Sequence, residues 1–161
     1  MYRENLIQVS EARSVAGSDG VLATDRALAA EVTNNDHIDP RGPICVVDDD
    51  RWVCDSVTVL LETYGFAVLA YPSGTQFLKD ERRVKAKCLV IDQHMPDMDG
   101  LEVVAALHRE GVSPPTVLIT GRLDAGIARR AGELGVREIL EKPFPVARLV
   151  ELIRGAVDRP D

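Results

Sequence analysis

Short, nearly continuous apolar runs alternate with amphipathic segments along most of this chain of 161 residues. The runs lie at 44–47, 66–71, 88–91, 116–119 and 138–140. This pattern is typical of strands that are buried on both faces of a parallel sheet, because neither face of such a strand meets water. We therefore predict five strands, all of them after residue 43.

Between these runs, apolar residues recur at the spacing of an α-helix. Val53, Val57 and Leu61 mark one such helix, and Gly65 is expected to end it. Further helices are predicted over about 73–79, before Gly111, before Gly135 and over 146–157. Five strands that alternate with five helices predict a doubly wound α/β fold, in which right-handed crossovers join the strands of one parallel sheet.

The first 42 residues lack strand-like runs and differ from the rest of the chain. An alanine-rich stretch at 21–32 could form a weak helix, and 33–43 has the composition of a linker. The sequence thus predicts three parts. These are a flexible or weakly helical tail over 1–42, a folded domain over 43–157 and a short tail over 158–161.

Composition narrows the class of protein. The chain has 26 acidic and 19 basic residues and a net charge of −7, which argues against nucleic acid as its main partner. Its longest apolar run, at 66–71, is far too short to span a membrane, and no signal peptide is visible. Cys45, Cys54 and Cys88 have no paired spacing and are interpreted as reduced, buried thiols of a cytoplasmic protein.

Polar residues that follow the predicted strands carry the candidate chemistry. They are Asp48, Asp49 and Asp50 after the first strand, Asp92 after the third, Thr120 after the fourth and Lys142 after the fifth. Ligands of doubly wound sheets bind beyond the carboxyl ends of the strands, so these side chains are expected to converge. Neighbouring carboxylates repel unless a cation joins them, and Mg²⁺ suits such oxygen ligands. A carboxylate beside a cation, a hydroxyl and a lysine is equipped to become an aspartyl phosphate.

Taken one at a time, these residues have simpler interpretations. Asp50 is expected to cap a helix, Thr120 precedes a glycine as in many turns, and Lys142 could be a solvated loop lysine. Their joint occurrence at four strand ends of one sheet favours the functional interpretation.

The segments 46–50, 92–100, 120–121 and 141–144 together resemble the receiver domain of bacterial response regulators, and most closely receivers of the FixJ/LuxR type. The resemblance covers about residues 43–157 and leaves the N-terminal tail unexplained. It implies a flavodoxin-like fold with the strand order 2-1-3-4-5.

The resemblance also implies a phosphoacceptor and a metal site. Asp92 would accept the phosphoryl group. Mg²⁺ would be bound by Asp49 directly, by Asp48 through water, by Asp92 and by the backbone carbonyl of His94.

Further roles come from the same resemblance. Thr120 would be the switch hydroxyl, and Lys142, before a cis proline bond, would pair with phosphoryl oxygens. The family usually has Tyr or Phe at the switch position of the fifth strand, where this chain has Ile139, so coupling to the surface is expected to differ. Beside the pocket, His94 is expected to face solvent, and Arg122 could reach a phosphate.

The expected function is that of a receiver in a two-component system or phosphorelay. A sensor histidine kinase or histidine phosphotransfer protein would be the phosphoryl donor, and the chain would act on no other substrate as an enzyme. Phosphorylation would change a surface of the domain, the switching surface. This surface would contact an unknown downstream protein or a second copy of the chain in a phosphorylation-dependent homodimer. Candidate residues of that surface are Arg129, Arg130, Arg137 and Arg148. Because few residues follow Lys142, a stand-alone receiver is favoured over a fragment of a DNA-binding regulator.

Two other functions fit part of the pattern. A magnesium-dependent phosphohydrolase of the haloacid-dehalogenase type would use Asp48 and Asp50, although Trp52 departs from the residue expected there. Trp52 could otherwise be half-exposed packing or a fluorescent reporter of the pocket. The third possibility is a degenerate receiver that serves as a binding module, which the complete set of pocket residues disfavours.

Overall fold

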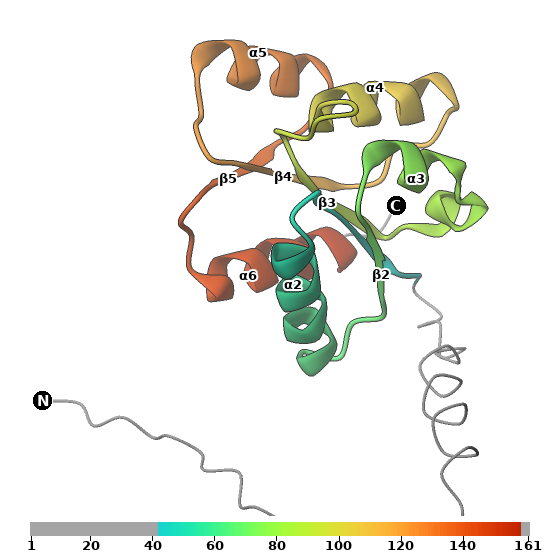
Figure 1. Ribbon diagram of the computed structural model, residues 1–161, viewed down its shortest axis with the longest axis vertical. Helices are drawn as coiled ribbons and strands as arrows, with labels where there is room; N and C mark the ends of the chain where they lie inside the picture. The colour runs from blue at the N-terminus through green and yellow to red at the C-terminus, as the bar shows by residue number, and fades with distance from the viewer. Residues whose placement is uncertain (1–41, 159–161) are drawn as a thin grey trace, which may run out of the picture. The chain divides into compact units, whose positions relative to one another are not determined.

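The computed structural model describes residues 42–158, which form a five-stranded parallel sheet between two layers of helices (Figure 1). The strands are β1 (Ile44–Val47), β2 (Val68–Tyr71), β3 (Cys88–Asp92), β4 (Thr116–Thr120) and β5 (Glu138–Glu141). Their order in the sheet is β2-β1-β3-β4-β5, so the predicted topology is confirmed. The order reverses between β1 and β3, which places the ligand site of such a fold beyond the carboxyl ends of these two strands.

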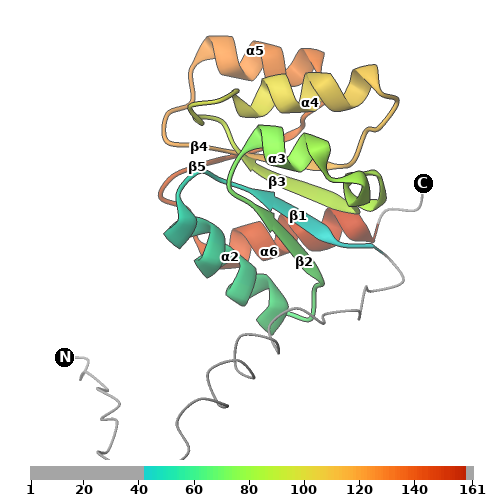
Figure 2. The same cartoon turned by 45° about the vertical axis from the view of Figure 1, so that its right-hand side comes forward.

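Helices cover both faces of the sheet (Figure 2). One face carries α2 (Arg51–Thr63) and α6 (Val146–Val157), and the other carries α3 (Gly74–Lys79), α4 (Gly100–Arg109) and α5 (Ala125–Glu133). The strands contribute alternate side chains to the two layers. Cys45 and Val47 pack on the side of α4, whereas Ile44 and Val46 pack on the side of α2 and α6. β1 is buried along its whole length, as its apolar run predicts.

β2 begins two residues later than its apolar run suggests, because the end of α2 uses the residues in between. Gly65 adopts a positive φ of 84°, and the Phe66 N–H donates to the Leu61 carbonyl at 3.1 Å. This bond satisfies a carbonyl at the end of the helix, and the left-handed backbone favours glycine at position 65. The prediction that Gly65 ends the helix is confirmed.

A short 3₁₀ helix, η1 (Glu81–Lys85), was not predicted. Its residues are mostly charged and have no apolar periodicity, so a pattern-based analysis treats them as loop. Asp80 starts the turn by accepting from the Arg82 N–H at 2.9 Å, and Arg83 forms an ion pair with Glu110 near the end of α4. The turn has no apolar face, and local capping and one distant ion pair stabilise it instead.

The three cysteines are buried free thiols, as predicted. Burial raises the pKa of Cys45 to about 12 and that of Cys88 to about 12. Trp52 is not half-exposed as expected, since 82% of its surface is open to solvent. Within residues 42–158, no helix is long and apolar enough to cross a membrane. The predicted tails, including the weak helix over 21–32, lie outside the described residues except for Gly42 and Asp158.

Candidate functional site

A pocket of about 410 Å³ lies at the carboxyl end of the sheet. The register of the parallel strands creates it, because Val47 pairs with Ile91, so that Asp48, just after β1, and Asp92, at the end of β3, come next to each other. The predicted site residues line this pocket, with the exception of Thr120. They are Asp48, Asp49, Asp92, His94 and Lys142.

Asp92 is the last residue of β3 and is only 5% exposed. Its Oδ1 lies 2.9 Å from the Lys142 ammonium, and its Oδ2 accepts from the His94 backbone N–H at 2.8 Å. Its backbone is tightly packed, because a Cβ at Gly100 would lie 2.6 Å from the Asp92 carbonyl oxygen. Both carboxylate oxygens are thus held in a defined orientation, and glycine is required at the start of α4.

Lys142 follows β5 and lies between two carboxylates. Its Nζ is 2.9 Å from Asp92 and 3.6 Å from Asp48. The Lys142 N–H donates to the Thr120 carbonyl at 2.8 Å, and the bond to Pro143 is cis, as the resemblance implied. Burial lowers the pKa of Lys142, but its hydrogen bond to Asp92 and the charge of Asp48 raise it more, so the net pKa is above its usual value. The ammonium is therefore charged at neutral pH.

The three consecutive aspartates after β1 have different environments. Asp48 is buried, and its Oδ1 accepts from the Asp50 N–H at 2.8 Å. Burial raises the pKa of Asp48, and the charges of Asp92 and Asp49 add to the increase. Asp49 is exposed on the pocket wall. Asp50 caps α2 as predicted, because it accepts from the backbone N–H groups of Trp52 and Val53.

The oxygen ligands fit the predicted Mg²⁺ in their chemistry. Three carboxylates line one pocket, and burial, with a smaller contribution from the charges of Asp92 and Asp49, raises the pKa of Asp48, so that a bound cation would stabilise its ionised form. No three His, Cys, Asp or Glu side chains among residues 42–158 are already arranged as a metal site. The Lys142 ammonium instead bridges two of the candidate ligands, Asp92 and Asp48.

Thr120 is fully buried, and its hydroxyl is hydrogen-bonded to the backbone of Arg122. The Oγ1 atom donates to the Arg122 carbonyl at 2.8 Å and accepts from the Arg122 N–H at 3.2 Å. These bonds hold the turn between β4 and α5. For the hydroxyl to reach a phosphoryl group on Asp92, it would have to exchange the Arg122 carbonyl for a phosphoryl oxygen, and this turn would change with it.

The remaining predicted residues surround the pocket. His94 is exposed, as expected for its side chain, and it contributes its backbone N–H to Asp92. Arg122 is exposed and lines the pocket wall. Ile139 lies half-buried against the core on the α4 side. As an aliphatic side chain it offers no hydrogen bond to the turn after Thr120.

Sequence analysis missed the contacts of three polar residues near the site. Gln93 is buried, and its Oε1 accepts from the Leu101 N–H at 3.2 Å. Asp99 forms a capping box with Glu102, which the spacing of these two residues could have indicated. Arg130, expected to be exposed, instead forms an ion pair with Asp99, and no local pattern signals a contact across 31 residues of sequence.

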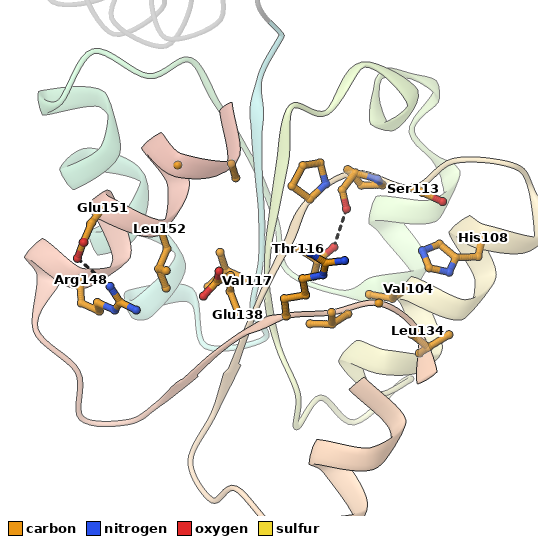
Figure 3. A pocket seen from close by; sticks show the side chains of 17 residues that line it. Val104, His108, Ser113, Thr116, Val117, Leu134, Glu138, Arg148, Glu151 and Leu152 are labelled. Carbon is orange, nitrogen blue, oxygen red and sulfur yellow. Dashed lines mark hydrogen bonds and ion pairs between the residues drawn. The ribbon is translucent and has the colours of Figure 1, made fainter. Parts of the chain in front are cut away.

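A larger pocket, of about 620 Å³, lies around the amino end of β5 (Figure 3). Val104 and His108 of α4 border it on one side, and Arg148 and Glu151 of α6 border it on the other. The two α6 side chains neutralise each other at 2.9 Å. None of the predicted site residues lines this pocket, so convergence of charged groups, and not volume, identifies the candidate site.

Comparison with known proteins agrees with this geometry. The family model of the response regulator receiver domain matches residues 44–154. The transcriptional regulatory protein FixJ of Azorhizobium caulinodans is 35% identical over 117 residues, which cover 73% of this chain and 56% of that protein. The response regulator protein TmoT of Ectopseudomonas mendocina is 34% identical over 119 residues, covering 74% and 54%. The chain thus spans about half the length of these relatives.

Solved structures show the same fold. The crystal structure of FixJ-N aligns with a TM-score of 0.67 at 33% identity, covering 74% of this chain and 95% of that one. The receiver domain of DrrB, activated with BeF₃, aligns with a TM-score of 0.65 at 26% identity, covering 73% and 97%.

Proposed function

The chain belongs to the response regulator receiver domain family, and from this premise we propose that Asp92 accepts a phosphoryl group from a phosphohistidine of a partner protein. The donor would be a sensor histidine kinase or a histidine phosphotransfer protein. The observation that carries the proposal is the Lys142 ammonium, 2.9 Å from Asp92 and 3.6 Å from Asp48 at the mouth of one pocket.

In the proposed transfer, a carboxylate oxygen of Asp92 attacks the phosphorus atom of the phosphohistidine. A P–O bond forms, the P–N bond breaks, and the imidazole leaves with the electron pair and takes a proton. Asp92 is suited to this attack because the His94 N–H and the Lys142 ammonium fix its two oxygens. Lys142 would pass from the carboxylate to an equatorial phosphoryl oxygen and neutralise its charge.

Bound Mg²⁺ would neutralise further charge on the phosphoryl oxygens during transfer. The residues that would hold it are Asp48, Asp49, Asp92 and the backbone carbonyl of His94. The raised pKa of Asp48 supports this assignment, since a buried carboxylate without full compensation favours a cation.

We further propose that phosphorylation is transmitted through the turn after β4. Thr120 would release the Arg122 carbonyl and hydrogen-bond a phosphoryl oxygen, so that the turn and α5 change position. The surface that includes α5 and β5 would then contact a downstream protein or a second copy of the chain. The hydrolase alternative is less well supported, because Asp50 uses its carboxylate to cap α2.

Intact mass spectrometry after incubation with acetyl phosphate and Mg²⁺ tests the proposal. We expect the wild type to gain one phosphoryl group and the Asp92→Asn variant to gain none. The matched control is Asp97→Asn, in the loop that follows β3, because Asp97 accepts hydrogen bonds from Thr75 and does not line the pocket. A stable phosphoryl adduct on Asp92→Asn would refute the assignment, and many turnovers of phosphomonoesters by the wild type would favour a hydrolase.

A further inference from the structure

Helix α5 is packed more weakly than its neighbour α4. It buries two residues, Ile127 and Ala131, whereas α4 buries five over a similar length. The residues that follow α5, Leu134 and Gly135, also line the larger pocket, which Val104 of α4 borders as well (Figure 3). Few apolar contacts thus fix the position of α5, and polar contacts carry correspondingly more weight.

Two neighbouring arginines of α5 form different ion pairs. Arg129 contacts Glu133 at 3.0 Å within the same helix, and both side chains are highly exposed, at 70% and 60%. Arg130 instead reaches Asp99, the cap of α4, with one nitrogen at 2.9 Å and the other at 3.2 Å. Arg130 thus contacts Asp99 through two nitrogens, and the two side chains are only 39% and 29% exposed. This ion pair therefore restricts α5 more than the pair of Arg129 and Glu133 does.

Asp99 itself is rigidly connected to the phosphoacceptor. It caps α4 and is followed by Gly100, whose N–H donates to the Gln93 carbonyl at 3.1 Å. Gly100 also lies directly against the carbonyl of Asp92. The contact of Arg130 with Asp99 therefore connects α5 to the loop that directly follows Asp92.

The other end of α5 is connected to Thr120. The turn before the helix is held by the bond from the Thr120 hydroxyl to the Arg122 carbonyl, and the Leu123 N–H contacts Glu141 at 3.4 Å. If Thr120 leaves Arg122 for a phosphoryl group, the start of α5 loses one support while Arg130 still holds the helix to Asp99. Ile139 offers no polar contact in either position.

We propose that the Arg130–Asp99 ion pair is a latch that holds α5 in its resting position and so opposes phosphorylation of Asp92. This inference rests on the proposed function of Asp92. A contact made in only one of two states adds its free energy to the equilibrium between them, so loss of the latch favours the phosphorylated state. Arg130 is a positioning residue, because it acts through Asp99 and does not line the pocket of Asp92.

The test compares Arg130→Gln with the control Arg129→Gln in beryllofluoride binding with Mg²⁺, measured by calorimetry on the full chain. We expect Arg130→Gln to bind about three- to tenfold more tightly than the wild type, as suits a partly exposed bidentate pair. Arg129→Gln should stay within about twofold, because its pair lies within one exposed helix. Equal or weaker binding by Arg130→Gln would overturn the latch.

Two further measurements keep this test decisive. Asp99→Asn retains a good helix cap but loses the charge, so it should match Arg130→Gln, and the double variant should gain nothing more. Hydrogen exchange of the α5 amides, measured without beryllofluoride, should be faster in Arg130→Gln than in Arg129→Gln. A wild type that fails to bind beryllofluoride would contradict the proposed function, whereas a wild type that binds as Arg130→Gln does would contradict the latch alone.

Discussion

Two carboxylates of this domain, Asp48 in the pocket and Asp80 between α3 and η1, have opposite electrostatic situations. Burial raises the pKa of Asp48, and the neighbouring acids Asp49 and Asp92 raise it further. The hydrogen bonds of Arg82 lower the pKa of Asp80 to about 2, and the Tyr71 hydroxyl also donates to it at 3.0 Å. The domain therefore compensates Asp80 fully and Asp48 only in part.

This difference shows which region is organised for stability and which for chemistry. Asp80 has its partner Arg82 in the same segment, and its ionisation stabilises the fold. Around Asp48, the Lys142 ammonium lies 3.6 Å away and is shared with Asp92. Incomplete compensation of buried carboxylates is unfavourable for folding, and it supports the proposed binding of a cation and a phosphoryl group in this pocket.

The largest expected effect comes from removing the shared cation. Lys142→Met should slow labelling of Asp92 by acetyl phosphate about 100-fold, because an ammonium aimed at developing charge contributes that much to such reactions. The rate is measured by intact mass spectrometry, with Lys79→Met, on the exposed surface of α3, as the control. Equal rates for the two variants would show that Lys142 does not contribute to phosphorylation of Asp92.

A smaller effect is expected from Asp80→Asn, which should lower the free energy of unfolding at pH 7 by about 1 kcal/mol, since water screens the exposed Arg82. The folded pKa of about 2 lies below the ordinary aspartate value of 3.8, so ionised Asp80 stabilises the fold above pH 3.8 and loses this effect as the pH falls toward 2. Urea unfolding at several pH values should show the variant and the wild type converging in acid. A difference that persists at pH 2 would contradict this origin.

The smallest effect has the opposite sign. Asp48→Asn should raise the free energy of unfolding at pH 7 by about 0.5–1 kcal/mol, as removal of functional strain often does. The folded pKa of Asp48 is raised, so its ionisation opposes folding above that pKa, and the gain should shrink as the pH falls through it. Urea unfolding without Mg²⁺ measures the gain. Destabilisation as large as that of Asp80→Asn would show that Lys142 compensates Asp48 fully.

Much of the fold was predictable because local patterns determine it. Runs such as 44–47 and 88–91 can be satisfied only as buried strands, and Gly65 marks the end of α2 through its backbone freedom. The start of β2 and the turn η1 were not predictable in this way. The first depends on which carbonyls the end of α2 requires, and the second on an ion pair between Arg83 and Glu110.

The residues that line the pocket could be predicted from the order of strands and polar residues along the chain, because parallel strands bring the residues after Val47, Ile91 and Glu141 to the same end of the sheet. The partners of these side chains are known only from the folded structure. Lys142 bridges two carboxylates, Thr120 turns toward Arg122, and Arg130 joins α5 to the cap of α4. These hydrogen bonds and ion pairs depend on distances and burial among residues that are far apart in the chain, and a local pattern of residue types does not contain that information.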